Sequence, residues 1–303
     1  MFLEIFAPKQ PPEPIEVSNE LRGWAWRSPP VAPLLDDLKL GIWEAASKYC
    51  ETKRDVYLRR ILGIKPKPSQ AMLKGKAVHN LMVVLIREFK EELLKEPRTG
   101  SELYTSLCLR RDRLIKEVLR KFSLNPDFAP KLASFYNYLA LQLSAEYDKV
   151  VSEAPRSLRQ LISDKILEIT SERAVDGARV GLSNWLMIDV YVPPVTIVEI
   201  KTGAVREFHR LSIAGYGLAM ESSEYVPINH GYLLYVHLNN GIHLLRKLIK
   251  LTDEVRREFL EERDRVMELI YSERDPGIPS NCPRSCPFYY YCRGDEDEEA
   301  DNQ

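Results

Sequence analysis

The stretch 188–203 constrains the fold most strongly, because two short apolar runs flank a Pro-Pro corner and carry charges where buried strands ordinarily carry none. Successive strand residues point to opposite faces, so Glu199 and Lys201 share one face of the second run. A reversal of the chain at the prolines would bring Asp189, on the first run, beside Glu199. The sequence therefore predicts a hairpin that gathers two carboxylates and one lysine in a small volume.

Charges inside an apolar strand are costly to bury unless a partner offsets them. Carboxylate oxygens suit Mg²⁺ or Mn²⁺, and a lysine beside them can stabilise charge on a phosphate or orient an attacking water. The alternative is a solvated edge hairpin with ordinary surface charges. The apolar runs around these charges favour the metal-binding interpretation.

Asp189 followed by Glu199-Ile200-Lys201 resembles the D…(D/E)-x-K core of the restriction-endonuclease-like nucleases, the PD-(D/E)xK superfamily. The segment E-I-K-T-G is similar to the motif of their RecB-type branch. The resemblance implies an α/β fold with a mixed sheet at its core and metal-dependent cleavage of DNA. It also implies that Asp189, Glu199 and the Ile200 carbonyl hold Mg²⁺ or Mn²⁺, while Lys201 acts in catalysis.

A helix expected over 69–94 contains G-K-A-V-H, which places His79 in an apolar stripe. From the residues alone, a histidine on such a face is either a hydrogen-bonded core residue or a ligand. The segment resembles the G-x-x-x-H helix that precedes the sheet in RecB-type nucleases. That resemblance implies that His79 completes the metal shell.

The stretch 205–221 predicts an amphipathic helix with His209 and Tyr216 on one face. RecB-type nucleases usually carry Q-x-x-x-Y here, and Tyr216 matches the tyrosine while Ser212 stands at the glutamine position. The resemblance implies that Tyr216 positions the DNA strand. Ser212 cannot replace an amide that donates and accepts over a longer reach.

Three closely spaced cysteines near the C-terminus, Cys282, Cys286 and Cys292, form C-x3-C-x5-C. Such a cluster predicts a metal or iron–sulfur site, which needs a fourth ligand. Cys50 is the candidate, although a lone cysteine is also a common small core residue. Cys108 has no cysteine near it in the sequence and is expected in the core.

This arrangement resembles the iron–sulfur staple of RecB-like nucleases, with one cysteine before the nuclease motifs and three after them. It implies a [4Fe-4S] cluster held by Cys50 and the three C-terminal cysteines. The aromatic residues between the last two cysteines look closest to the CRISPR-associated exonucleases, the fourth Cas family and its archaeal subtype. The usual spacing there is C-x2-C-x5-C, so the extra residue leaves zinc as an alternative.

The resemblance implies a DNA exonuclease that acts on single-stranded ends during CRISPR spacer acquisition, together with the integrase proteins and other acquisition proteins. Ser212 and the cysteine spacing keep open a non-catalytic subunit that binds DNA ends. A zinc-stapled nuclease of a repair system is a third possibility. Metal content and hydrolysis distinguish the three.

Composition fits a DNA-binding globular protein once the C-terminus is considered separately. The 303 residues carry a net charge of −1, but six acids lie in 295–303, and without them the remainder is +5. No apolar run reaches the roughly 18 residues of a membrane span, and the N-terminus lacks the basic region of a secretory signal. We therefore expect a cytoplasmic protein without membrane contact.

The chain divides into five expected regions. The regions are a proline-rich arm (1–33), a helical region contributing Cys50 and His79 (34–160), a nuclease core (161–250), a C-terminal helix with the cysteine cluster (251–294) and an acidic tail (295–303).

Individual elements are also expected from the sequence. The N-terminal portion is predicted to be helical, with a helix over 34–62 and helices through 101–168. Further strands are expected at 163–170, 179–182, 231–238 and 241–249, and a charged helix at 252–272.

Overall fold

A computed structural model describes residues 13–153 and 168–294. Within these residues, five strands form one mixed sheet in the order β1-β2-β3-β4-β5. The β3–β4 pair is parallel, and the β1–β2, β2–β3 and β4–β5 pairs are antiparallel. The strands are β1 (Thr170–Val175), β2 (Leu186–Val192), β3 (Thr196–Lys201), β4 (His230–His237) and β5 (His243–Lys250).

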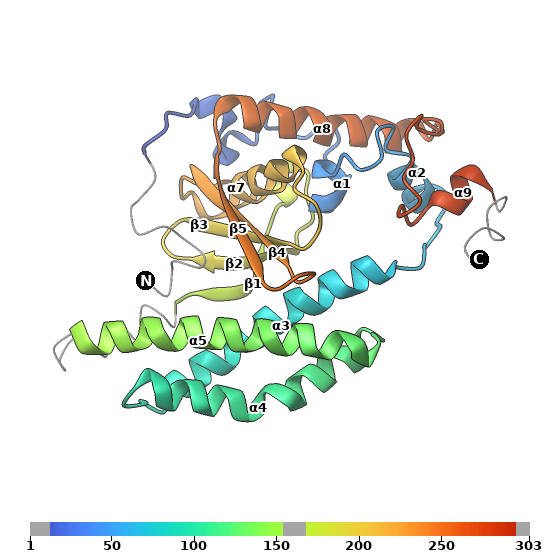
Figure 1. Cartoon of the computed structure of the whole chain (residues 1–303). Coiled ribbons are helices and arrows are strands. Elements are labelled where there is room, and N and C mark those ends of the chain that lie inside the picture. The colour runs from blue at the N-terminus through green and yellow to red at the C-terminus, as the bar shows by residue number, and fades with distance from the viewer. Residues whose placement is uncertain (1–12, 154–167, 295–303) are drawn as a thin grey trace.

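Helices cover both faces of the sheet (Figure 1). Helices α3, α4 and α5 lie on one side, α7 and α8 lie on the other, and the short α9 lies near α2 at one end of the molecule. The helices are α1 (Ile42–Ala46), α2 (Arg54–Arg60), α3 (Gln70–Leu93), α4 (Gly100–Lys121), α5 (Ala129–Glu153), α7 (Arg210–Glu224), α8 (Asp253–Ser272) and α9 (Tyr289–Arg293). Short 3₁₀ turns are η2 (Asn19–Leu21), η3 (Gly23–Ala25), η4 (Pro126–Phe128), η5 (Ala178–Val180) and η6 (Glu207–His209).

The two layers of helices bury two separate hydrophobic cores. Strand residues such as Val198 and Leu234 pack with α3, α4 and α5. Residues of the opposite parity, such as Ile197 and Leu233, pack with α1, α7 and α8. This alternation is what a sheet with both faces covered requires, and it explains why the interior of β4, residues 231–236, carries no charged residue.

The crossover from β3 to β4 sets the position of the site. Parallel neighbours need a long connection, and α7 supplies it by running back over the sheet. The carboxyl end of β3 and the start of α7 therefore lie on the same side of the sheet.

The described part of the proline-rich arm, from residue 13 to 33, is held to the body by buried arginines. Glu221 of α7 is fully buried and pairs with Arg22 and with Arg256 of α8, each at 2.8 Å. Arg263, also fully buried, donates to the carbonyls of Val31 and Pro30 at 2.7 and 3.1 Å. These charge-assisted contacts fix an arm that has little regular structure.

The expected helix over 34–62 is wrong, because the chain forms two short helices there, α1 and α2. Lys53 separates them with a left-handed backbone (φ 61°), and its buried ammonium group donates to the carbonyls of Ala45 and Ser47 at 3.2 and 2.6 Å. The helical spacing of aromatic residues was misleading, since Trp43 and Tyr49 are exposed.

The expected strand at 179–182 is also wrong. Residues 178–180 form η5, Gly181 has φ 75°, and only an isolated bridge between Leu40 and Leu182 remains. The first strand begins at Thr170, so the expected strand at 163–170 overlaps it by one residue and otherwise falls mostly outside the described residues. The helices expected over 69–94 and 252–272 are confirmed as α3 and α8.

Helices in the two described ranges are all too short or too polar to cross a membrane. The acidic tail, 295–303, lies outside the described residues.

Candidate active site

The predicted hairpin is formed by β2 and β3. Val192 pairs with Thr196 and Val190 with Val198, which makes Asp189 and Glu199 the next facing residues. Beyond Val190 and Val198 no further backbone pair of the two strands is formed. Instead, the Asp189 carboxylate receives the next backbone N–H group: its Oδ2 accepts a hydrogen bond of 2.7 Å from Ile200 N. The hairpin thus brings Asp189 and Glu199 together and fixes the orientation of Asp189.

Strand β2 changes face at Asp189. Leu186 and Ile188 pack in the core beside α7, whereas Val190 packs in the core beside α3. A regular strand would keep all three on one face. Opposite Asp189, Glu172 of β1 has a left-handed backbone (φ 53°), and no backbone pair is made there. This local irregularity turns the carboxylate of Asp189 toward α3.

His79 reaches the carboxylates from α3. Its Nε2 lies 2.8 Å from Asp189 Oδ1. Burial lowers the pKa of His79, but Asp189, with smaller contributions from Glu172 and Glu199, outweighs burial and raises the pKa above its usual value. The structure therefore brings together the histidine and the two acids that the sequence singled out.

Glu199 and Lys201 form an ion pair in a nearly dry environment. Lys201 Nζ lies 2.5 Å from Glu199 Oε1, and the Glu199 residue is 6% exposed. Burial raises the pKa of Glu199, and Lys201 opposes the shift while Asp189 adds to it. The pKa of Lys201 is raised because Glu199 and Asp189 outweigh the effect of burial. Two carboxylates, Asp189 and Glu199, therefore lie close to Lys201, so the negative charge exceeds the positive charge of this lysine.

One buried oxygen of this cluster has unused bonding capacity. Glu199 Oε2 has no hydrogen-bond partner among the described residues, whereas His79 Nε2 is paired with Asp189 Oδ1 at 2.8 Å. An orphaned buried carboxylate oxygen is costly unless a cation or a donor meets it. Oxygen and imidazole donors together fit Mg²⁺ or Mn²⁺. The side chains as they stand, within 13–153 and 168–294, form no group of three or more His, Cys, Asp or Glu arranged to hold a metal ion.

Tyr216 and Ser212 lie on α7 beneath the cluster. The Tyr216 hydroxyl donates to the Met187 carbonyl at 2.8 Å, which ties α7 to β2 two residues before Asp189. Ser212 lies near Glu199, but its hydroxyl donates to the His209 carbonyl at 3.1 Å. Tyr216 therefore supports β2, and its predicted contact with DNA remains a prediction, as does the role of the Ile200 carbonyl.

The four cysteines proposed to form one cluster come from segments far apart in the sequence, and Cys50 is within electrostatic reach of both Cys282 and Cys286. All are free thiols. Cys50 lies between α1 and α2, and the three others lie on the segment that ends in α9. Arg54 of α2 donates to Cys292 Sγ at 3.2 Å and pairs with Asp275 at 2.7 Å, so α2 is joined directly to the C-terminal segment.

The cysteines also affect one another's pKa values through electrostatic repulsion between thiolates. Burial, with smaller contributions from Cys282 and Cys50, raises the pKa of Cys286 to about 11. The pKa of Cys282 is raised by burial, with Cys292 and Cys50 contributing. Four soft donors that repel one another as thiolates, beside the Arg54 guanidinium, suit a thiolate-bound metal or cluster. Cys108 is separate, with its Sγ 4.0 Å from Asn137 between α4 and α5.

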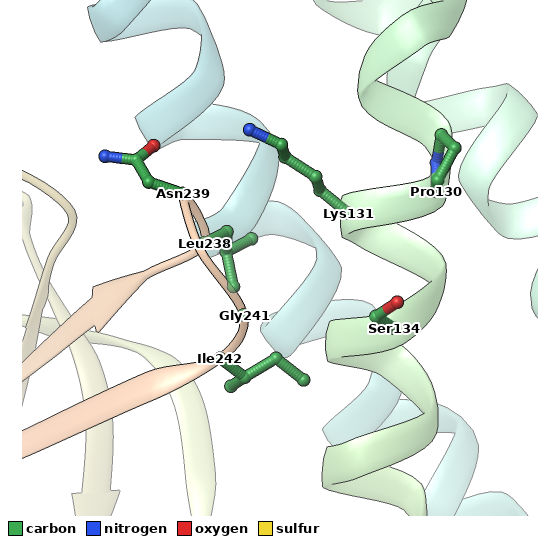
Figure 2. Close-up of a pocket in the computed structure, with 7 residues that line it drawn as sticks. All are labelled: Pro130, Lys131, Ser134, Leu238, Asn239, Gly241 and Ile242. Carbon is green, nitrogen blue, oxygen red and sulfur yellow. The ribbon is translucent and has the colours of Figure 1, made fainter.

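A small pocket of about 170 Å³ lies elsewhere, between the β4–β5 turn and the start of α5 (Figure 2). Lys131 and Asn239 reach its rim, and Leu238 and Ile242 form its apolar wall. Asp189, Glu199 and Lys201 do not line this pocket.

Comparison with known proteins identifies the family of the chain. The family model described as CRISPR-associated exonuclease Csa1 matches residues 7–296. The chain belongs to the Csa1 family. It is 32% identical over 283 residues to the CRISPR-associated exonuclease Csa1 of Saccharolobus solfataricus, covering 92% of this chain and 93% of that protein. It is 30% identical over 285 residues to the Csa1 of Thermoproteus tenax, with the same coverage.

Membership of the Csa1 family spans the N-terminal arm and the 101–160 helices, which the sequence motifs alone did not cover. Three residues that lie near the site were not predicted from the sequence: Tyr49, Tyr235 and Glu172. No motif marks them. Tyr49 lies in an expected helix that does not form, and Glu172 depends on a backbone irregularity. The pairing of Tyr235 with Lys201 could have been found only by aligning β3 with β4.

Proposed function

We propose that this protein is a Mg²⁺- or Mn²⁺-dependent exonuclease that hydrolyses DNA from single-stranded ends during CRISPR spacer acquisition. The observation that carries the proposal is Glu199 Oε2, a buried carboxylate oxygen without a partner, beside Asp189, His79 and Lys201. Family membership supports the exonuclease activity, because the matched relatives carry that name.

The residues divide the work by their chemistry. His79, Asp189, Glu199 and the Ile200 carbonyl would hold the metal, which supplies Lewis-acid polarisation of the phosphate and lowers the pKa of a bound water. Lys201, held by Glu199, orients the attacking water and offsets negative charge on the phosphate in the transition state. Burial of Glu199 keeps bulk water away from this side of the site and strengthens both interactions.

The supporting residues act on the backbone of β2. Tyr216 holds the Met187 carbonyl, and Ile200 N holds Asp189 Oδ2, so the carboxylate is oriented before substrate arrives. Preorganised groups of this kind lower the reorganisation needed during the reaction. Because Tyr216 is only 5% exposed, it would position the DNA strand indirectly, through β2 and Asp189.

Cys50, Cys282, Cys286 and Cys292 would hold a [4Fe-4S] cluster. Their soft donor set and mutual proximity support it, and zinc is the alternative because of the C-x3-C spacing. The cluster would join the loop after α1 to the C-terminal segment and restrain Tyr49, the residue before Cys50. We propose the integrase proteins and other acquisition proteins of the pathway as partners.

A second candidate is a subunit that binds DNA ends without cutting them. Ser212 favours it, because its hydroxyl is used by the His209 carbonyl and leaves no amide for DNA at the usual glutamine position. The intact Asp189, Glu199 and Lys201 favour hydrolysis. The two candidates differ in one observable, which is metal-dependent cleavage.

The metal site is tested directly by Mn²⁺ titration followed by electron paramagnetic resonance, which measures free Mn²⁺ independently of activity. Wild type is expected to bind one or two ions, and Glu199→Gln to bind them at least about tenfold more weakly. Glu92→Gln is a matched control, since Glu92 is also buried and paired with a lysine, at 2.6 Å. Equal binding by wild type and Glu199→Gln contradicts the proposed site.

A further inference from the structure

The Tyr49 side chain is exposed to solvent yet held in place. It is 56% exposed, but its hydroxyl lies 2.9 Å from His209 Nε2. Its ring meets Phe208 edge to face, with centroids 4.8 Å apart and planes at 86°. An exposed tyrosine is ordinarily free to change rotamer, so a ring fixed by both a hydrogen bond and an aromatic contact needs a further explanation.

The group that holds Tyr49 is linked to the catalytic strand. His209 is 3% exposed, and its Nδ1 lies 2.9 Å from the Tyr235 hydroxyl. Tyr235 of β4 is the register partner of Lys201 of β3. Two hydrogen bonds therefore connect the Tyr49 hydroxyl to the residue beside the catalytic lysine, which places the ring at the rim of the candidate site.

The loop that carries Tyr49 is also rigid. Lys53, which is 2% exposed, donates to the carbonyls of Glu44, Ala45 and Ser47, at 3.2, 3.2 and 2.6 Å. These bonds replace water at the end of α1 and fix the loop over residues 47–53. The ring of Tyr49 is therefore anchored through its backbone as well as through its hydroxyl.

Positive charge lies at the same rim. Burial raises the pKa of Tyr49, and Lys201 and Arg206 act against that shift, so both cations are within electrostatic reach of the hydroxyl. Arg206 is exposed. An accessible aromatic face beside exposed positive charge is the combination that sequence-tolerant sites for single strands use.

We propose that Tyr49 forms a stacking subsite for a nucleobase of a single-stranded DNA end whose phosphate lies at the Asp189–Glu199–Lys201 cluster. This inference rests on the proposed function and specifies how that site takes its substrate. Because the ring is already fixed, stacking costs little conformational entropy. Arg206 would contact the backbone of the same strand. A duplex end, whose bases are already stacked and paired, would use the subsite poorly.

The test uses the full-length protein and an oligonucleotide carrying 2-aminopurine at its end, whose fluorescence is quenched by stacking. Ca²⁺ replaces Mg²⁺ or Mn²⁺ under conditions where hydrolysis is negligible. Tyr49→Ala is expected to lose the quenching and to bind roughly 5- to 100-fold more weakly. Tyr49→Phe, which keeps the ring and loses only the hydroxyl, is expected to retain most of both. Tyr271→Ala removes a tyrosine that is 77% exposed on α8 and should change neither.

An oligonucleotide with an abasic end separates stacking from a structural effect. Wild type and Tyr49→Ala should bind it equally, because no base is present to stack. Equal weakening on the abasic and the base-containing ends, or unchanged quenching in Tyr49→Ala, overturns the stacking subsite. A wild type that quenches 2-aminopurine but never hydrolyses DNA overturns the nuclease proposal and leaves the subsite standing, so the two failures are distinguishable.

Discussion

Gly75 of α3 lies directly against Thr202: a Cβ atom on residue 75 would lie 2.6 Å from Thr202 Oγ1. Gly75 precedes His79 by about one helical turn, and Thr202 follows Lys201. The missing side chain therefore lets α3 approach the end of β3 closely enough for His79 to reach Asp189. This contact explains why a glycine stands four residues before the histidine in the G-x-x-x-H segment.

Gly75→Ala is expected to move α3 away from β3 and to reduce DNA hydrolysis roughly 10- to 100-fold, as small displacements of catalytic groups do. The free energy of unfolding should change little, because alanine favours the helix by about 1 kcal/mol and offsets part of the clash. Steady-state kinetics and chemical denaturation measure the two effects. Adding Thr202→Ala removes the clashing oxygen and should restore activity. A double variant as inactive as the single one contradicts this account.

The ion cluster around Glu221 is expected to be the strongest polar contribution to stability. Glu221→Ala leaves Arg22 and Arg256 buried without a carboxylate, which should lower the free energy of unfolding by about 3–5 kcal/mol. Denaturant unfolding measures the loss. Arg257→Ala serves as the control, since its ion pairs measure 3.7 and 3.8 Å and its side chain is half exposed, and its effect should stay within about 0.5 kcal/mol. Equal effects of the two changes would show that the buried cluster is not special.

The free energy of unfolding should decrease at acidic pH because His209 is buried in its neutral form. Burial, with smaller contributions from Lys201 and Arg206, lowers its pKa to about 4, and the hydroxyls of Tyr49 and Tyr235 lie within hydrogen-bond distance of its ring nitrogens. The unfolded chain takes up the proton near pH 6.5, but the folded chain does so only near pH 4. This contribution is therefore complete above pH 6.5 and is lost as the pH falls toward 4, by at most about 3 kcal/mol.

Unfolding free energies measured between pH 4 and pH 7 test this prediction. His209→Gln cannot titrate, so its stability should decline less over that interval than that of wild type. Parallel declines for the two proteins would show that other groups cause the acid sensitivity.

The cysteine cluster predicts a sharp difference between two substitutions. Cys292→Ser in anaerobically purified protein should lose most of the bound iron and its visible absorbance, and should unfold at a lower temperature. Cys108→Ser, which changes a thiol between α4 and α5, should keep its iron. Elemental analysis decides the metal: zinc in place of iron supports the alternative, and wild type without either metal contradicts a thiolate-bound centre.

The residues that the sequence predicted well are those whose positions follow from local periodicity. Glu199 and Lys201 share a face because of two-residue alternation, and the register of the hairpin places Asp189 opposite Glu199. His79 lies on a helix whose spacing is unambiguous. A single sequence is sufficient for such relationships, since the partners lie on adjacent or regular elements.

The relationships that the sequence did not predict depend on tertiary contacts. Lys53 ends a helix by bonding its carbonyls, which residue spacing cannot reveal. The change of face in β2 depends on the backbone of Glu172 in another strand. Tyr49 joins the site only through His209 and Tyr235, from three separate parts of the chain. Each of these would require knowledge of which elements pack together.

Metal-dependent hydrolysis by this site is tested by Mn²⁺-dependent degradation of end-labelled single-stranded DNA by wild type and Lys201→Ala, matched for bound metal at the cysteines. Lys95→Ala is the control, because Lys95 is also paired with a glutamate, Glu92, at 2.6 Å, but lies at the end of α3. We expect wild type and Lys95→Ala to degrade the DNA and Lys201→Ala to lose at least about 100-fold in rate. Equal, negligible activity in all three proteins would contradict the nuclease and favour a subunit that binds DNA ends.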